Sequence, residues 1–465
     1  MIALQIVFSI LSTVLLGFLA LKLVHVLQLG GYRAWRFARW TFSMNTRYTM
    51  ILFVISLLGF GSCLALTMFL KGAWAYLGLI LYFALGSWAV YLNWKTPTKV
   101  PLRYTARIIR LFVVSVVLCW GLSFAVLWFA AVWCLPLLSV ILPGIVLLGC
   151  LIVWPVELLI RQIYITRATK KLFSPQYASL IRIGITGSYG KTTCKNILAA
   201  MLSQKYKVVA SPASFNTPMG WSKTVLEALK PEHEVFIMEM GARRKGDIKT
   251  MVKLFRPHHG LLTGVGSAHL ETFKTVENIR KEKYELINAI TDGVKITNDE
   301  RRMTNNELCA EMARALGVTD KQIESAIAEL KPVPHRLEII KTEHGVTIID
   351  DSYNACPESV VAALDKLREL TTDRKAIVMT PGLVELGKAA YHENFIFGKN
   401  IASVADKVII VNELNKTALT DGLKDGGFAI ENILYARNLE DAKAMLGAKK
   451  GDVVLIANDL PDNFV

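Results

Sequence analysis

Acidic side chains are nearly absent from the first third of this sequence. Residues 1–173 contain 15 lysines and arginines but only one acid, Glu157. The rest of the chain carries 38 basic and 37 acidic residues, so the formal net charge of +15 comes almost wholly from the first part. Because the polar remainder is close to neutral, the composition argues against nucleic acid as a partner, although the high isoelectric point would suggest one.

Cysteines at metal-binding spacing are also missing. The seven cysteines include no CxxC pair, which excludes a zinc cluster or a disulfide framework as the organising element. The chain has no internal repeat and no low-complexity tract. It also offers no convincing Ser/His/Asp or Cys/His set, so a mechanism that depends on a protein nucleophile is not indicated.

Long apolar runs are abundant. Five segments of about 20 residues or more are long enough to cross a bilayer, namely 2–26, 49–70, 73–92, 111–133 and 135–160. Basic residues cluster at 33–47, at 95–110 and after Arg161. Because basic loops stay on the cytoplasmic side, we expect an external N-terminus and a multi-pass protein of the inner (cytoplasmic) membrane with a cytoplasmic C-terminal part. The membrane domain is predicted to cover residues 1–175.

The remainder alternates between short β-rich runs and amphipathic helical stretches, which is typical of parallel α/β domains. A first alternation predicts a domain over 176–332, with strands at 180–185, 208–210, 235–240 and 260–265. The segment Lys331–Pro334 is a plausible hinge. A second alternation predicts a smaller Rossmann-like domain over 333–465, with strands at 346–351, 375–380, 407–411 and 452–457. The predicted fold class is therefore a helical membrane region followed by two α/β domains.

A glycine-rich loop, Thr186–Thr193 (TGSYGKTT), lies between the first predicted strand and an amphipathic helix. This is the context of a phosphate-binding loop, in which backbone N–H groups and the helix N-terminus hold phosphate oxygens. Lys191 would reach the terminal phosphates of ATP, and the Thr192 hydroxyl would bind Mg²⁺. The strict pattern has glycine at position 185, where this chain has isoleucine, so the loop alone is weak evidence.

Three further residues stand at positions that suit chemistry. Glu239 ends a predicted strand before a glycine, where it is either a metal ligand or a solvated acid. His269 follows another strand, and Lys283 lies on a predicted helix. Taken singly, such a histidine is more often structural and such a lysine more often a surface charge.

The order and spacing of several motifs make the case specific. The phosphate loop is followed by EMGA at Glu239, AHLExF at His269 and KxE at Lys283. Further on come Asn298-Asp299, Pro334-His-Arg336, the segment DDSYNACP at 350–357, and Glu385-Leu-Gly387 with His392. In these motifs the chain resembles the Mur ligase superfamily, most closely its MurF type, which joins D-Ala-D-Ala to the muramoyl tripeptide. The resemblance implies a central P-loop ATPase domain and a C-terminal Rossmann-like domain, with ATP and Mg²⁺ as cofactors.

The resemblance also implies roles for individual residues. The ATP phosphates would be held by Lys191 and by the loop residues Thr186, Gly187, Ser188, Gly190, Thr192 and Thr193. Mg²⁺ would be organised by Thr192, Glu239 and His269, and a carbamylated Lys283 would support a second Mg²⁺. Lys191, His269 and Lys283 form the implied catalytic set. The rest of the nucleotide would be contacted by Asn306, Arg336, Asp351, Tyr353 and Asn354, and the acceptor by Asn216.

In this family ATP converts a carboxylate into an acyl phosphate, which an amine then attacks. The chain departs from the family where the acceptor binds. The apolar region stands in place of the UDP-sugar-binding domain, the segment between Asn298 and Asn306 is short, and Leu383 replaces an aspartate. A KGSR-like segment near the C-terminus is replaced by Ala457–Asn463. We therefore expect an amide ligase of cell-envelope or surface-polymer biosynthesis that joins an amino acid or peptide amine to a lipid-linked or membrane-held glycan acceptor.

Two alternatives remain open at this stage: a poly-γ-glutamate-type polymerase, and a nucleotide-driven assembly or transport factor. Few charged residues lie within the apolar spans, which disfavours transport. The segment Tyr32–Trp40 alternates arginines with aromatic residues. It is expected to lie at the membrane interface as a loop, where it either anchors the chain or binds a lipid phosphate.

Overall fold

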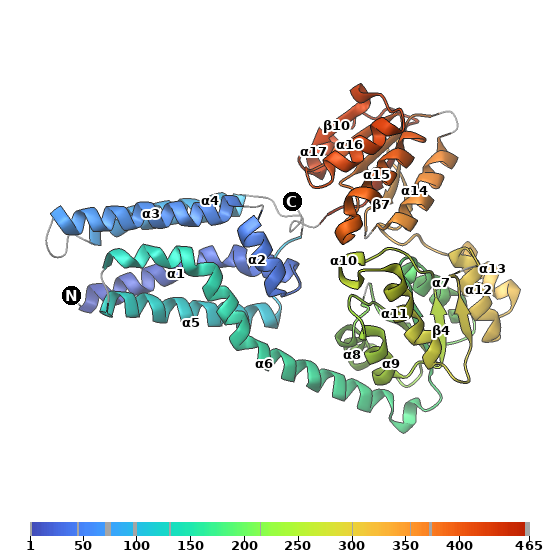
Figure 1. Ribbon diagram of the computed structural model, residues 1–465. Helices are drawn as coiled ribbons and strands as arrows, with labels where there is room; N and C mark the ends of the chain where they lie inside the picture. The colour runs from blue at the N-terminus through green and yellow to red at the C-terminus, as the bar shows by residue number, and fades with distance from the viewer. Residues whose placement is uncertain are drawn as a thin grey trace. The chain divides into compact units, whose positions relative to one another are not determined.

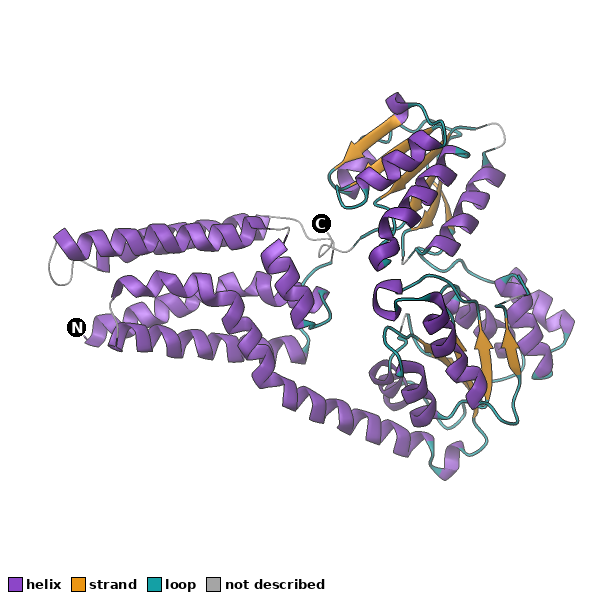
Figure 2. Cartoon of the chain, viewed as in Figure 1, coloured by secondary structure: helices purple, strands orange, loops and turns teal. Residues whose placement is uncertain are grey.

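The computed structural model describes residues 2–43, 46–69, 76–95, 100–129, 132–213, 215–299, 301–353, 355–371 and 374–460. The chain forms two compact units, one built on Met1–Ile160 and the other on Arg161–Asp459 (Figure 1). The first contains only helices, and the second contains all of the described strands, arranged in two separate sheets (Figure 2).

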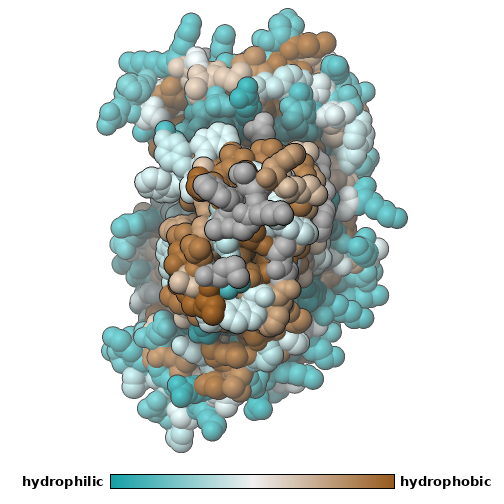
Figure 3. Space-filling view, turned by 90° about the vertical axis from the view of Figure 1, so that its left-hand side faces the viewer, coloured by the Kyte–Doolittle hydropathy of each residue, from teal (hydrophilic) through white to brown (hydrophobic). Residues whose placement is uncertain are grey.

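The helical unit is apolar inside and outside. Its helices are α1 (Ile2–Leu29), α2 (Ala34–Ser43), α3 (Thr46–Phe69), α4 (Gly78–Lys95), α5 (Ala106–Phe129), the 3₁₀ turn η2 (Val132–Leu137) and α6 (Leu138–Leu172). α1 packs along α5 and α3 packs along α4, around buried residues such as Leu19 and Cys119. Large apolar side chains also point outward, including Leu57 (56% exposed) and Val117 (58% exposed). Figure 3 looks along these helices onto their ends, and many of the coloured residues of the unit are apolar there too. Outward apolar side chains along the helices are expected where the solvent is lipid.

Four described helices are long and apolar enough to cross a membrane: Ile2–Leu29, Tyr48–Phe69, Ala106–Phe129 and Val132–Leu172. They correspond to four of the five expected spans. The fifth, expected at 73–92, coincides with α4, and its first residues lie outside the described part of the chain. α4 has 18 residues, which gives a length of about 27 Å, slightly less than a bilayer's hydrocarbon core. It also ends on the polar pair Asn93 and Lys95.

The segment expected to be a basic and aromatic loop is a helix over most of its length. α2 is strongly amphipathic. Phe37 is buried in the helical core, whereas Trp35 is 46% exposed and carries the Arg36 guanidinium 5.3 Å from its ring centroid. A loop is expected there because the segment lies between two apolar spans, whereas the structure forms a short amphipathic helix.

The first sheet of the second unit is parallel, with strand order β2-β3-β1-β4-β5. Its strands are β1 (Ile181–Thr186), β2 (Val208–Ala210), β3 (Val235–Met240), β4 (His259–Leu262) and β5 (Lys295–Thr297). The helices between and after them are α7 (Lys191–Ser203), α8 (Pro218–Glu227), α9 (Asp247–Phe255), α10 (Leu270–Phe273), α11 (Val276–Ala289), α12 (Asn305–Ala315) and α13 (Asp320–Ala328). Both faces of the sheet are covered, so β1 and β3 are buried along nearly their whole length.

The second sheet has the order β10-β9-β8-β11-β7-β6, and only β6 runs antiparallel among its described pairs. Its strands are β6 (Glu338–Lys341), β7 (Thr347–Asp351), β8 (Ala376–Thr380), β9 (Lys407–Val411), β10 (Ile433–Ala436) and β11 (Val453–Ala457). The helices of this part are α14 (Pro357–Leu370), α15 (Ala390–Ala402), α16 (Lys416–Asp425) and α17 (Leu439–Ala444), with the short 3₁₀ turns η4 (Gly387–Ala389) and η5 (Ile430–Asn432). The two sheets lie on either side of the predicted hinge at 331–334, and the exact domain boundary stays a prediction.

α6 belongs to both units. It is one helix of 35 residues. Its last turns carry Ala168 and Leu172, which are buried in the core that covers one face of the first sheet. Lys171 donates to the carbonyl oxygen of Leu229 at 2.7 Å, and the 3₁₀ turn η3 (Pro175–Tyr177) leads into β1. An apolar helix therefore passes without interruption into the α/β unit.

Candidate active site

The candidate site lies where the central strands of the first sheet end. The register pairs Ile185 with Glu239 and Thr186 with Met240, while Thr186 also pairs with Leu262 of β4. Because the strands are parallel and in step, the segments that follow β1, β3 and β4 leave the sheet at one edge. Ligands of such sheets bind beyond the carboxyl ends of the strands.

Ile185, which departs from the strict phosphate-loop pattern, is a core residue. It is the penultimate residue of β1, and its side chain is fully buried in the cluster that packs against α7. The loop proper therefore starts at Gly187. The deviation therefore lies in the buried strand, before the loop that would face the phosphates.

Two glycines give the loop its shape. Gly187 has φ +154°, and a Cβ there would lie 2.0 Å from Thr263 Oγ1. Gly190 has φ +72° and is the N-cap of α7. Between them, the Ser188 amide donates to Gly264 O at 2.8 Å, and its hydroxyl contacts both backbone groups of Gly266. Positive φ and the lack of room for a side chain explain why only glycine suits these two positions. These contacts hold the loop in one conformation, and the N-terminus of the 13-residue helix α7 follows directly after it. The N–H groups and the dipole at that helix N-terminus favour anion binding.

Lys191 extends over this loop. Its Nζ donates to Gly187 O at 2.8 Å and to Ser188 O at 3.1 Å. Loss of water around the ammonium lowers the pKa of Lys191, an effect that the charge of Glu239 opposes and that of Arg336 adds to. Thr186 donates to Met240 O at 3.1 Å, and Thr193 is half-buried on α7. The predicted phosphate-binding residues are thus contiguous and face one edge.

Thr192 and Glu239 meet directly. The Thr192 hydroxyl donates to Glu239 Oε2 at 3.0 Å, and both side chains are buried. Hydroxyl and carboxylate oxygens are donors that Mg²⁺ prefers, so the residues present fit this ion. Trp221 Nε1 donates to the Glu239 carbonyl at 3.0 Å and fixes the strand end.

A residue that the sequence analysis missed completes this group. Lys195, one turn after Lys191 on α7, is 1% exposed, and its Nζ lies 3.2 Å from Glu239 Oε2. It also donates to the carbonyl of Ala213. Burial lowers the pKa of Lys195, and the adjacent Glu239 carboxylate opposes that shift. The position i+4 to Lys191 on a helix was readable from the sequence, but its burial was not.

The buried pair gives a stability prediction. In Glu239→Gln the Lys195 ammonium remains buried without a counter-charge, so the free energy of unfolding should fall by roughly 3–5 kcal/mol. The double variant Glu239→Gln/Lys195→Met removes both charges and should recover most of that loss without recovering ligase activity. Thermal unfolding of the purified full chain in detergent measures both changes.

The matched control is the exposed pair Glu277 and Lys281 on α11, whose side chains are 60% and 73% exposed. Glu277→Gln should change stability by no more than about 0.5 kcal/mol. A Glu239→Gln protein as stable as this control would show that the Lys195 pair is not the buried ion pair described.

His269 is held in a left-handed conformation (φ 63°, ψ 28°) at the N-cap of α10. Its Nδ1 contacts Glu385 Oε2, and the Glu271 amide donates to the Glu385 carbonyl at 2.8 Å. Burial lowers the pKa of His269, whereas the hydrogen bond and charge of Glu385 raise it. Glu385 therefore orients the imidazole and leaves its Nε2 as the atom that can face a metal ion.

Lys283 on α11 is 3% exposed. Burial, and to a lesser extent the charge of Lys191, lower its pKa from 10.5 to about 7, which places the two amines within electrostatic reach of each other. Its neighbour Glu282 accepts the amides of Gly246 and Ile248 at 2.7 Å each and so caps α9. α11 therefore presents a buried amine that is largely neutral near pH 8.

The C-terminal sheet supplies a second group. The Arg336 guanidinium lies 4.6 Å from the Tyr353 ring centroid, and Asp351 accepts the Leu337 amide at 3.2 Å. Burial raises the pKa of Asp351 to about 6. Arg336 also acts on the pKa of Lys191, which links this group to the phosphate loop. Asn354, predicted in the same motif, lies outside the described residues.

Two predicted asparagines are placed less directly. Asn216 lies against the glycine after β3, since a Cβ at Gly241 would come within 2.6 Å of its side chain. Asn306 is exposed, and its neighbour Asn305 is the one that approaches the loop. Asn305 Oδ1 accepts from Cys194 Sγ at 3.2 Å and lies 2.9 Å from where a Cβ of Gly190 would be. Asn305 therefore lies nearer to the phosphate loop than Asn306 does, and the role of Asn306 in nucleotide binding stays a prediction.

Two family models match the chain. The Mur ligase middle domain matches residues 185–350, and the Mur ligase, glutamate ligase domain matches residues 335–458. Together with the phosphate loop and its surroundings, they define the class of protein, an ATP-dependent ligase. The chain belongs to the Mur ligase superfamily, whose cofactors are ATP and Mg²⁺. The predicted family, fold class and enzyme class are confirmed.

Individual relatives agree. The UDP-N-acetylmuramoyl-tripeptide–D-alanyl-D-alanine ligase of Bacillus subtilis (strain 168) is 27% identical over 341 residues, which cover 58% of this chain and 74% of that protein. The ligase of the same name from Mycobacterium bovis is 27% identical over 59% of this chain and 69% of its own length. Among solved structures, MurF ligase from Thermotoga maritima in complex with ADP has a TM-score of 0.56 and 25% identity, covering 64% of this chain and 80% of that one. MurF from Acinetobacter baumannii has a TM-score of 0.55 and 22% identity, covering 64% and 77%.

Proposed function

We propose that this chain is a membrane-embedded ligase of peptidoglycan or related envelope synthesis that joins an amino acid or peptide amine to a membrane-linked acceptor carboxylate. The observation that carries the proposal is α6. This helix starts in an apolar unit and ends with Ala168 and Leu172 in the core of the ligase unit. A ligase built on such a helix works at the membrane surface, where lipid-linked substrates are concentrated.

The orientation supports the same proposal. The basic residues near the ends of the apolar helices include Arg36 on α2, Lys95 at the end of α4, Arg107 at the start of α5 and Arg161 on α6. By the positive-inside rule these ends face the cytoplasm, where ATP is available. We propose five crossings with an external N-terminus, with α4 as the shortest span, and a cytoplasmic ligase unit.

In this proposal, residues of both α/β domains contribute to the site. We propose that Lys191 and the loop amides hold the phosphates, while Thr192, Glu239 and His269 surround Mg²⁺. Bound ATP with Mg²⁺ supplies the phosphoryl group that makes the acceptor carboxylate electrophilic. Contacts across the two sheets, such as the amide of Ser267 donating to Glu358 Oε1 at 2.8 Å, hold the domains together and help to exclude water from a hydrolysable acyl phosphate.

The test compares two acceptors that share one carboxylate-bearing peptide. Purified full chain in lipid nanodiscs receives ATP, Mg²⁺ and D-Ala-D-Ala, with muramoyl tripeptide linked either to UDP or to a polyprenyl diphosphate. We expect kcat/KM for ADP release to be at least about 10²-fold higher with the membrane-linked acceptor, because both partners share a surface.

Equal or faster ADP release with the soluble UDP-linked peptide would contradict a membrane-linked acceptor. Other amino acids in place of D-Ala-D-Ala identify the amine, and product mass separates one addition from chain growth. Release of ADP without any new amide bond would refute the ligase assignment itself.

A further inference from the structure

The helical unit contains a charged cluster that its packing does not neutralise. Glu157 of α6 accepts from Arg110 Nε at 2.8 Å and Nη2 at 2.5 Å, and Arg107 Nε lies 3.9 Å from its other oxygen. Glu157 is 14% exposed, and the two arginines on α5 are 37% and 35% exposed. With two cations and one anion, the cluster keeps a net positive charge beside the membrane.

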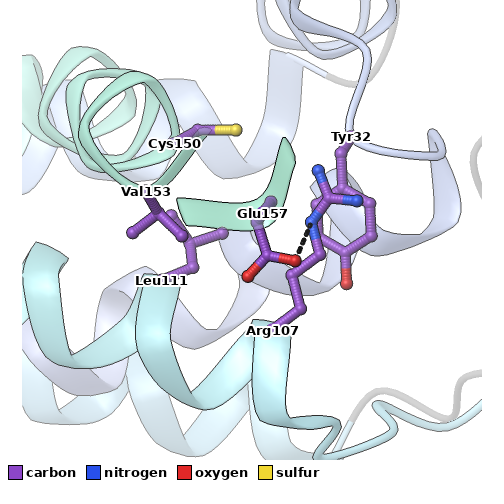
Figure 4. A pocket seen from close by; sticks show the side chains of 6 residues that line it. All are labelled: Tyr32, Arg107, Leu111, Cys150, Val153 and Glu157. Carbon is purple, nitrogen blue, oxygen red and sulfur yellow. Dashed lines mark ion pairs between the residues drawn. The ribbon is translucent and has the colours of Figure 1, made fainter. Parts of the chain in front are cut away.

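A small pocket of about 10 Å³ lies at this cluster (Figure 4), which is room for about one water molecule, so a larger anion can bind only at its mouth. The Arg107 guanidinium lies 3.6 Å from the ring centroid of Tyr32, and the Glu157 carboxylate points toward the same guanidinium. Leu111, Cys150 and Val153 line the opposite wall. Within the part of the chain that the structure describes, neither the Nη groups of Arg107 nor the Tyr32 hydroxyl has a hydrogen-bond partner. These donors and the excess positive charge suit an anion, and a guanidinium fork matches phosphate oxygens in particular.

An apolar groove adjoins the pocket. It lies between α5 and α6, has a volume of about 300 Å³ and is lined by Ile109, Val113, Val114, Ile152 and Val156, with Arg110 as its polar residue. Val153 lines both the groove and the pocket. Val113 and Ile152 are 52% and 48% exposed, so the groove is open to the hydrocarbon of a bilayer. A volume of this size lies in the range of small-ligand sites.

We propose that the pocket and groove together bind the lipid carrier of the acceptor. The hydrocarbon chain of a polyprenyl-type lipid lies in the α5–α6 groove, and its phosphate or diphosphate binds at the mouth of the pocket, where Arg107, Arg110 and the Tyr32 hydroxyl offer donors. This inference rests on the proposed membrane-linked acceptor. Charge complementarity selects an anionic lipid, and α6, which lines the site, continues into the ligase core. The glycan and peptide of such a lipid would extend from the basic, cytoplasmic end of the helical unit.

The experiment measures lipid retention by native mass spectrometry of the full chain in detergent. The probes are polyprenyl diphosphate, phosphatidylglycerol and phosphatidylcholine at equal concentration. We expect polyprenyl diphosphate to be retained best and phosphatidylcholine least. Equal retention of phosphatidylglycerol and polyprenyl diphosphate would overturn the assignment to the acceptor's carrier and indicate a general anionic-lipid site.

Four variants test the residues. Arg107→Gln/Arg110→Gln should lower retention of polyprenyl diphosphate at least about tenfold, and Val113→Trp should lower it by filling the groove. Glu157→Gln removes the competing carboxylate and should leave retention equal or higher. Arg161→Gln, which removes an exposed charge one turn beyond Glu157 and lines neither cavity, is the matched control and should behave as the unmodified chain.

These variants also separate the site from a purely structural ion pair. A structural pair predicts equal loss of stability for Glu157→Gln and the double arginine variant, with no change in lipid preference, and that result would overturn the proposal. Because the double arginine variant leaves Glu157 unpaired and risks misfolding, Val113→Trp and Glu157→Gln carry the test independently.

Enzyme assays distinguish failure of this site from failure of the proposed function. If polyprenyl diphosphate binds as expected but its peptide-linked form never stimulates ADP release, the lipid-binding site is supported and the hypothesis of a membrane-linked acceptor is refuted. If ADP release depends on the lipid-linked acceptor but neither Val113→Trp nor the double arginine variant changes its KM, the proposed function stands and this site is refuted.

Discussion

Lys191→Ala is expected to reduce amide-bond formation by at least about 10³-fold. The Lys191 ammonium lies over the phosphate loop, bonded to the carbonyls of Gly187 and Ser188. The phosphoryl group and the acceptor carboxylate are both anions, and their approach requires a fixed positive charge. Removal of one preorganised group that stabilises developing charge typically costs 10²–10³ in rate, and phosphate binding weakens in addition. ADP release and amide product are to be measured over a range of ATP concentrations, so that losses in kcat and in kcat/KM are both recorded.

The control for this variant is Lys223→Ala. Lys223 lies on α8 and is exposed, so the same truncation should leave the rate unchanged. Because Lys191 also braces the loop, thermal unfolding of the variant shows whether lost activity reflects lost structure. A folded Lys191→Ala protein that makes product at more than about a tenth of the original rate would refute the assigned ligase chemistry.

Much of the site was predictable because parallel topology constrains it. Once Thr186, Glu239 and Thr263 are read as ends of neighbouring strands, the sheet must bring the residues after them to one edge. The order of motifs along the chain then assigned Lys191, Glu239, His269 and Lys283 to one place, and the structure couples their charges. Their individual roles stay predictions.

The contacts of the supporting residues were not predictable because their signals are nonlocal. Glu385 contacts His269 across 116 positions of sequence, and nothing in its own neighbourhood identifies that partner. Lys195 is one lysine among many until α7 packs it against Glu239. β5 and β6 were missed, as was β10, because all three have only three or four residues, and β5 and β6 also carry lysine or glutamate at their ends. Their strand conformation comes from pairing with β4 and β7.

Lys283→Met is expected to lower activity at least about 10²-fold and at the same time to stabilise the protein. The pKa of Lys283 is lowered from 10.5 to about 7 by burial, with a further contribution from Lys191. In the folded protein above pH 7 the amine is therefore mostly neutral, which is the form that can react with carbon dioxide to give a carbamate. The unfolded chain keeps the proton up to pH 10.5, so this residue makes stability rise with pH between about 7 and 10.5.

The size of both effects follows from these values. At pH 8, folding must remove a proton from a group whose unfolded pKa is 10.5, which costs roughly 3 kcal/mol. Methionine fills the same space without that cost, so the melting temperature should rise by several degrees. Activity should fall at least about 10²-fold, because neither the amine nor its carbamate remains to organise charge beside Lys191.

The pH dependence tests the chemistry of Lys283 directly. Activity of the unmodified chain should fall as pH drops through 7, where the amine becomes protonated, and added bicarbonate should reduce that loss. Lys283→Met should not respond to bicarbonate. Lys281→Met provides the control, since Lys281 lies on the same helix with a side chain that is 73% exposed, and its replacement should change neither activity nor melting temperature. A Lys283→Met protein that works within about twofold of the original rate would show that this buried amine takes no part in the reaction. A lowered melting temperature of that variant would contradict the lowered pKa of Lys283, on which the stability prediction depends.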